Sequence, residues 1–183
     1  MNKTQRNILN AAFEILAQDF SAPLEKIAEL AGVTRVTLHR YYSTRESLME
    51  ATGIELCRLT KQIIEDAKAA HDNPRDRLKN VIMTSAEMGE RFHFLMHAME
   101  HDDHEQHYPK FQEVEQLLAD LIETVRAEGF IREDVPTPWI VHIYYGIMSS
   151  SWRALHQGNV APNRIPELAW QSFTSGLFVD ETA

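Results

Sequence analysis

Four polar side chains that could read DNA lie close together in the segment TRVTLHRYY: Arg35, Thr37, His39 and Arg40. Arginine donates paired hydrogen bonds to guanine or to phosphate, and threonine hydroxyls bond to base edges. Leu38 stands between them at a spacing that would turn it to the opposite side of a helix. We therefore expect one short helix, residues 34–41, with a polar face that could enter the DNA major groove.

The preceding residues supply the elements that would position this helix. Apolar residues at positions 24, 27, 28 and 31 recur at i, i+3, i+4 and i+7, which predicts one face of a short helix. Gly32 suits the sharp turn where that helix ends, and Thr34 is a good N-cap for the next one. Two short helices joined by a glycine turn predict a helix-turn-helix. The alternative is an ordinary helical hairpin within an all-α protein.

Length, composition and charge are those of a globular protein with a proper core. The chain has 183 residues, 44% hydrophobic and 25% charged, and its net charge is −9. Residues 1–52 hold six basic and six acidic side chains, so residues 53–183 carry the whole acidic excess. A neutral module with a basic face can bind DNA while an acidic body limits nonspecific binding. No apolar run suits a membrane span or a secretory signal, and the single cysteine, Cys57, cannot form an intrachain disulfide. These features predict a cytoplasmic protein without a membrane partner.

Almost every periodic segment repeats at the helical period of 3.6, so we predict an all-α fold of about nine helices. The expected helices end near residues 18, 31, 41, 70, 89, 100, 128, 156 and 178. The fourth, about 45–70, is long and follows a Ser or Thr cap. We predict a DNA-binding domain over residues 1–46 and a second helical domain over residues 47–183.

The motif IAELAGVTRVTLHRYYSTRESLMEA resembles the signature of the TetR/AcrR-like bacterial transcriptional regulators, and the resemblance covers residues 8–51. It implies a DNA-reading helix over residues 34–41 and a fourth helix whose start contacts the DNA backbone. His39 stands where the family usually has tyrosine, and the link between the first two helices is shorter than usual. The DNA-contacting residues that the resemblance implies are Thr34, Arg35, Val36, Thr37, His39, Arg40, Tyr41 and Arg45.

The resemblance also implies a homodimer that a small-molecule effector releases from a palindromic operator, acting most often as a repressor. The segment WIVHIYYGIMSSSWRAL, residues 139–155, supports dimerisation because apolar residues alternate with small ones that let a second helix approach. The segment IPELAWQSFTSGLF, residues 165–178, would add a second helix to an intersubunit bundle. The alternative is that both segments bury each other within one subunit.

Aromatic and methionine side chains of the central helices could line a pocket for a hydrophobic effector. Each of them could equally be an ordinary core residue. The candidates are Met88, Phe92, Met96, Phe111, Tyr145 and Trp152.

The segment HFLMHAMEHDDHEQH, residues 93–107, is rich in histidine and could bind a metal ion. The candidate ligands are His97, His101, His104 and His107. A metal- or pH-responsive sensor is therefore the alternative function, and a solvated polar loop is the simpler interpretation. No cofactor is expected. The spacing fits neither a zinc protease nor a di-iron bundle, and no phosphate-binding glycine loop is present, so we predict no enzyme.

Overall fold

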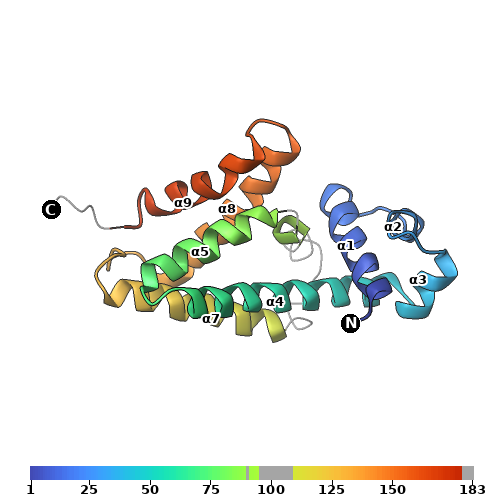
Figure 1. Cartoon of the computed structure of the whole chain (residues 1–183), viewed down its shortest axis with the longest axis horizontal. Helices are drawn as coiled ribbons and strands as arrows, with labels where there is room; N and C mark the ends of the chain where they lie inside the picture. Colours follow the sequence, from blue (N-terminus) through green and yellow to red (C-terminus); the bar gives the residue numbers. More distant parts are fainter. Residues whose placement is uncertain (90, 95–108, 179–183) are drawn as a thin grey trace.

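The computed structural model describes residues 1–89, 91–94 and 109–178. Three short helices form one end of an elongated molecule, and the remaining described helices form a larger body (Figure 1). The long helix α4, Arg45–Ala70, joins the two groups. The predicted all-α fold with an N-terminal helix-turn-helix is confirmed.

Helix α1 spans Lys3–Gln18, α2 spans Leu24–Leu30 and α3 spans Arg35–Tyr41. Asn2 begins α1 with a capping box, because its side chain accepts from the Gln5 N–H while the Gln5 side chain accepts from the Asn2 N–H. One side of α1 is buried against α2 and α4. These contacts form the core that carries α3.

The body is built from α4, α5 (Pro74–Glu87), α7 (Pro109–Ala127), α8 (Thr137–His156) and α9 (Ile165–Thr174). The short 3-10 helix η2, Pro162–Arg164, precedes α9. Helix α5 packs on α4, α7, α8 and α9, so it occupies the centre of the body. Tyr144 on α8 is fully buried there, and its hydroxyl donates to Ser85 Oγ on α5 at 2.8 Å. None of the described helices is long and apolar enough to cross a membrane.

The last helix is shorter than the sequence predicts. α9 ends at Thr174 rather than near Phe178, and Phe178 instead forms an isolated antiparallel bridge with Ile131. The Arg132 N–H donates to the Leu177 carbonyl at 2.9 Å. The apolar periodicity of residues 165–178 therefore continues past the helix, because the turn that follows α9 also packs side chains on the body.

The two segments expected to dimerise bury much of their apolar surface within the chain itself. Ile140, Tyr144 and Met148 of α8 are fully buried, and Phe173 and Leu177 are nearly so. The intrasubunit interpretation therefore holds for these side chains. The expected division between residues 46 and 47 falls inside α4, and it stays a prediction.

Candidate DNA-binding surface and effector groove

The turn between α2 and α3 has the geometry of a helix-turn-helix corner. Gly32 adopts a φ of +67°, in the left-handed region where a side chain would be strained. The Val33 N–H donates to the Ala28 carbonyl at 2.9 Å and satisfies a carbonyl of the last turn of α2. Thr34 then begins α3, and its hydroxyl accepts from the Thr37 N–H at 3.1 Å. The sequence-predicted corner is thus present.

The outer face of α3 is polar except at Val36. Leu38 is fully buried and fixes the opposite side of the helix in the core. Val36 is 79% exposed, and Arg35 and Arg40 are exposed beside it. An apolar side chain in this position could pack against a thymine methyl group in the major groove.

Arg35 and His39 belong to a row of polar contacts across this surface. Arg35 Nη1 lies 2.7 Å from Glu25 Oε1 of α2, and Arg35 Nε lies 3.4 Å from His39 Nε2. His39 Nδ1 lies 3.3 Å from the carbonyl oxygen of Ser43. Glu25 is a residue that sequence reasoning missed, because its distance of ten residues from Arg35 matches no helical spacing.

Tyr41 connects the end of α3 to the start of α1. The Asn2 side-chain amide donates to the Tyr41 hydroxyl at 3.2 Å, and the Arg40 guanidinium lies 5.5 Å from the centre of the Tyr41 ring. The hydrogen bond from Asn2 lowers the pKa of Tyr41, and Thr4 and Arg40 add to the effect. The N-terminus of α1 therefore lies beside the predicted DNA-binding face.

Arg45 occupies a different environment from the exposed arginines of α3. Its guanidinium donates to the Ala22 carbonyl through Nη1 at 2.6 Å and to the Phe20 carbonyl through Nη2. These contacts tie the first residue of α4 to the connection between α1 and α2. The expected phosphate contact of Arg45 stays a prediction, while the contacts seen are those of a structural clamp.

Phe92, Phe111 and Tyr145, three of the predicted effector-binding residues, come together in the body. The Tyr145 ring lies 5.7 Å from Phe111 and 6.4 Å from Phe92, and Tyr144 completes the cluster at 5.2 Å from Tyr145. Burial raises the pKa of Tyr145 well above its ordinary range. We refer to Phe92, Phe111, Tyr144 and Tyr145 as the aromatic cluster.

The other candidates lie elsewhere. Trp152 stacks between two imidazole rings, with His93 at 3.9 Å and His156 at 4.9 Å between ring centres. The Met88 sulfur lies 3.4 Å from the Arg91 guanidinium. Met96 is outside the described residues, as are the metal candidates His97, His101, His104 and His107. Among the residues that the structure does describe, no group of three potential ligands could hold a metal ion.

A groove of about 510 Å³ runs between α7 and α8. Its lining includes Glu115 and Ala119 of α7 and Val141 and His142 of α8. Glu115 is half-buried, and burial raises its pKa while His142 lowers it. Phe111 is one turn before Glu115, and Tyr145 one turn after Val141, so the aromatic cluster continues the line of the groove along both helices.

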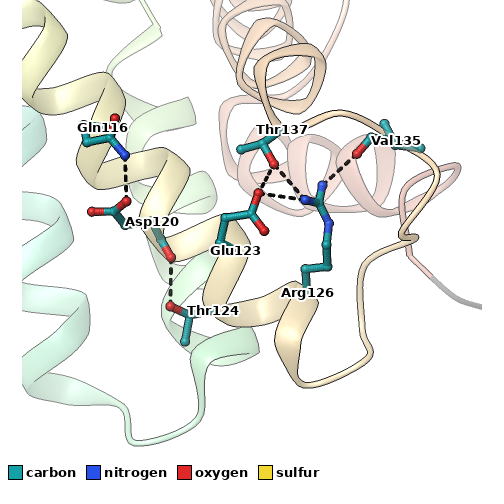
Figure 2. Close-up of polar contacts among 7 residues, drawn as sticks. All are labelled: Gln116, Asp120, Glu123, Thr124, Arg126, Val135 and Thr137. Carbon is teal, nitrogen blue, oxygen red and sulfur yellow. Dashed lines mark hydrogen bonds and ion pairs between the residues drawn. The ribbon is translucent and has the colours of Figure 1, made fainter.

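Polar contacts fix the other end of this groove (Figure 2). The Arg126 guanidinium lies 2.7 Å from Glu123, donates to the Val135 carbonyl at 2.7 Å and contacts the Thr137 hydroxyl at 2.8 Å. The Thr137 hydroxyl also contacts Glu123. The loop between α7 and α8 is thus held to both helices, which preserves the spacing of the groove walls. Asp120, which also lines the groove, accepts from Gln116 at 2.8 Å.

Residues 91–94 connect the aromatic cluster to the DNA-binding end. Phe92 packs on Tyr144 at 5.8 Å between ring centres, whereas Phe94 packs on Phe13 of α1 at 5.8 Å. The Arg91 guanidinium also lies 5.2 Å from the centre of the Phe13 ring. Side chains one or two residues apart therefore touch the body and the first helix of the DNA-binding end.

A helix-turn-helix with an exposed polar second helix defines a DNA-binding protein of the transcription-regulator class. Residues 8–52 match the sequence profile described as bacterial regulatory proteins, tetR family. The chain is 26% identical over 175 residues to the HTH-type transcriptional repressor LfrR of Mycolicibacterium smegmatis, covering 96% of this chain and 90% of LfrR. It is 24% identical to the HTH-type transcriptional regulator NfxB of Pseudomonas aeruginosa, covering 85% of this chain and 84% of NfxB.

Solved structures agree over almost the whole chain. The crystal structure of LfrR from Mycobacterium smegmatis in complex with proflavine matches with a TM-score of 0.80 at 25% identity, covering 97% of each chain. A TetR family transcription regulator from Marinobacter aquaeolei shares the fold, with a TM-score of 0.70 at 21% identity over 96% of each chain. Residues 8–52 thus carry the DNA-binding module of the TetR family, and almost the whole chain is similar to regulators of that family. The protein is a DNA-binding transcriptional regulator rather than an enzyme.

Proposed function

We propose that this protein is a homodimeric repressor that a small, flat, aromatic cation releases from a palindromic operator. The observation that carries the proposal is an exposed polar helix, α3, at one end of the chain, together with an acidic groove in the body that leads toward the aromatic cluster. The similarity to a repressor, LfrR, supports the direction of control, and the proflavine in one LfrR structure supports the class of effector. The protein would work in the cytoplasm, because it must reach the DNA that it would bind.

The DNA contacts would come from α3. Arg35, Val36, Thr37 and Arg40 are the residues whose side chains are best placed to reach bases or nearby phosphates, with Thr34 at the start of the helix. Tyr41 would contact the backbone from the end of the helix. Such contacts are local, because salt screens charges beyond about 8–10 Å. The acidic body would therefore not prevent binding.

Dimerisation would use the faces of α8 and α9 that the chain itself leaves uncovered. On α8, Trp139 is 60% exposed and Ile143 and Ile147 are half-buried in an otherwise well-packed body. A side-chain carbon at Gly146 would meet no atom within 4 Å, so a partner helix could approach closely there. Two-fold pairing through this face would present two α3 helices to successive half-sites about one DNA turn apart.

The effector would bind where the groove meets the aromatic cluster. A volume of about 510 Å³ falls within the range of about 300–1,000 Å³ that small-molecule sites occupy. Phe111 and Tyr145 would stack on a flat ring, and the Glu115 carboxylate would pair with its positive charge. A bound cation would also favour the ionised form of Glu115, whose burial otherwise favours the neutral form.

Release would follow from a shift between two body conformations. Ligand contacts at the aromatic cluster would displace Phe92, and residues 91–94 would transmit the displacement through Phe94 to Phe13 of α1. The conformation that the ligand stabilises would then hold the two α3 helices of the dimer at a spacing that does not fit one face of the DNA. The effect requires only that the ligand bind one conformation more tightly than the other.

The test uses full-length protein and a labelled duplex from upstream of its own gene. Fluorescence anisotropy should show tight, salt-sensitive binding that depends on the palindrome. Proflavine itself can bind DNA, so its affinity is first measured without DNA and its releasing effect is then compared between variants. Glu115→Gln should bind proflavine about tenfold more weakly, a factor that corresponds to about 1.4 kcal/mol, and should retain operator affinity.

Glu133→Gln is the matched control, because it removes one negative charge from an exposed loop position outside the groove. Equal proflavine affinity in wild type, Glu115→Gln and Glu133→Gln would refute the proposed effector site. A wild-type protein without palindrome-dependent binding would refute the proposed repressor function.

A further inference from the structure

A continuous row of polar contacts crosses the DNA-facing surface from α2 to the end of α3. Glu25 in the first turn of α2 pairs with Arg35 at the first position of α3, at 2.7 Å. Arg35 in turn contacts His39 one helical turn later, at 3.4 Å, and His39 contacts the Ser43 carbonyl at 3.3 Å. The row therefore links two helices and the turn that follows them.

The chemistry of the donors fixes the direction of each bond. A guanidinium can only donate, so His39 Nε2 must be the acceptor for Arg35 Nε. A carbonyl oxygen can only accept, so the His39 proton lies on Nδ1 and is donated to Ser43. One tautomer of His39, with the proton on Nδ1, therefore satisfies both contacts. Its ring contacts both the Arg35 guanidinium and the carbonyl of Ser43 in the turn that follows α3.

These contacts orient a long side chain that would otherwise be free to rotate. Side-chain exposure is 65% for Arg35 and 50% for Glu25, so core packing does not determine the orientation of the guanidinium. Glu25 engages Nη1 and His39 engages Nε, which sets the plane of the guanidinium and leaves Nη2 outside both contacts. Planar, oriented donors are what arginine uses to read the edge of a guanine.

We propose that Glu25 and His39 are specificity-determining positioning residues that hold Arg35 in the orientation with which it reads one base pair of the operator. This inference rests on the proposed DNA contacts of α3. It assigns His39 to Arg35 rather than to the DNA, and it gives a role to an acidic side chain on a face that meets phosphates. An acidic side chain on this face reduces the affinity for any DNA, whatever its sequence. Its benefit would be the orientation that it gives to the Arg35 guanidinium.

The experiment measures base preference with the full-length protein. A preferred duplex is selected from a randomised pool, and every position is then substituted in turn to give the discrimination at each base pair. Arg35→Ala identifies the base pair that Arg35 reads, where discrimination should fall about tenfold, within the range of one good arginine–base contact. Glu25→Gln and His39→Phe should each lose at least about threefold of the discrimination at that same base pair and little elsewhere.

Glu29→Gln is the control matched to Glu25→Gln, since Glu29 is an exposed acid on the same helix and its substitution changes the charge equally. It should raise affinity for all duplexes by a similar factor and leave base preference unchanged. Thermal unfolding of all variants separates a loss of folding from a loss of preference.

Two results would overturn the inference. If Glu25→Gln raised affinity uniformly, as Glu29→Gln does, with unchanged discrimination, Glu25 would act only as a charge. If Arg35→Ala changed no base preference, Arg35 would not read a base. In either case selective binding by the wild-type protein would leave the proposed repressor function standing, whereas loss of all sequence selectivity in the wild type would refute that function itself.

Discussion

Replacing Arg45 by alanine tests whether this residue holds the fold or contacts DNA. Its guanidinium donates to two backbone carbonyls, those of Phe20 and Ala22, and it is part-buried. A hydrogen bond to a charged group stabilises a protein by about 1.5–3 kcal/mol. Because Arg45 is partly solvated, we take the low end for the pair together, about 1.5–2 kcal/mol. For a chain of this size the midpoint of thermal unfolding should fall by about 3–8 °C.

Circular dichroism at increasing temperature and in urea measures the loss of stability. Operator affinity, measured between about 50 and 200 mM salt, separates the two roles of the arginine. A structural clamp changes affinity without changing the slope of log affinity against log salt, whereas loss of a phosphate contact flattens the slope by about one. We expect Arg45→Ala to destabilise the protein and to keep the wild-type slope.

Two variants serve as controls. Arg45→Lys keeps the charge but loses the planar fork that spans two carbonyls, so it should lose most of the same stability. Arg40→Ala removes an exposed arginine of α3 and should flatten the salt slope with little change in unfolding. Arg45→Ala could instead unfold at the wild-type temperature and flatten the slope of log affinity against log salt. That result would refute the structural role of Arg45 and support its contact with phosphate.

Three further substitutions probe the body. Tyr144→Phe removes a buried hydrogen bond to Ser85 and should cost about 1–2 kcal/mol in urea unfolding, and an unchanged midpoint would contradict the bond. Gly89→Ala would place a carbon 2.8 Å from the backbone nitrogen of Trp152 and should cost about 1–3 kcal/mol by overpacking, measured by thermal unfolding. Burial raises the pKa of Glu115 in the folded protein above its ordinary value of 4.5. The free energy of unfolding therefore falls as the pH rises from the unfolded-state pKa through the folded-state pKa of this carboxyl group. Glu115→Gln should therefore be more stable than wild type at pH 8 and equal to it at low pH, and identical pH–stability curves would contradict this.

Local signals in the sequence predicted the helices well. Thr44 and the His71–Pro74 segment mark both ends of α4, because a capping hydroxyl and a proline-containing break act on neighbouring backbone. Gly32 likewise indicated the corner of the helix-turn-helix. The predicted end of α9 was wrong, because apolar periodicity does not distinguish a continuing helix from a turn that also packs on the body.

Contacts between distant residues were beyond the reach of the sequence. Phe111 and Tyr145 were each recognised as candidates, but only the packing of α7 on α8 shows that they meet. The position of Arg45 at a helix start predicts a phosphate contact, which stays a prediction, but no spacing rule reveals that its side chain also contacts the carbonyls of Phe20 and Ala22. Glu115 was missed because a single acid in an amphipathic helix resembles any solvated one.

The length of α4 gives small movements of the body a large effect at the DNA. Its 26 residues span about 39 Å at 1.5 Å per residue. If the body end acts as a pivot, a tilt of about 5° displaces the start of the helix by about 3.4 Å, close to the 3.4 Å spacing of successive bases along a DNA strand. If α4 moves as a rigid body, an angular change too small to disturb the packing of the body would therefore displace α3 by about one base pair.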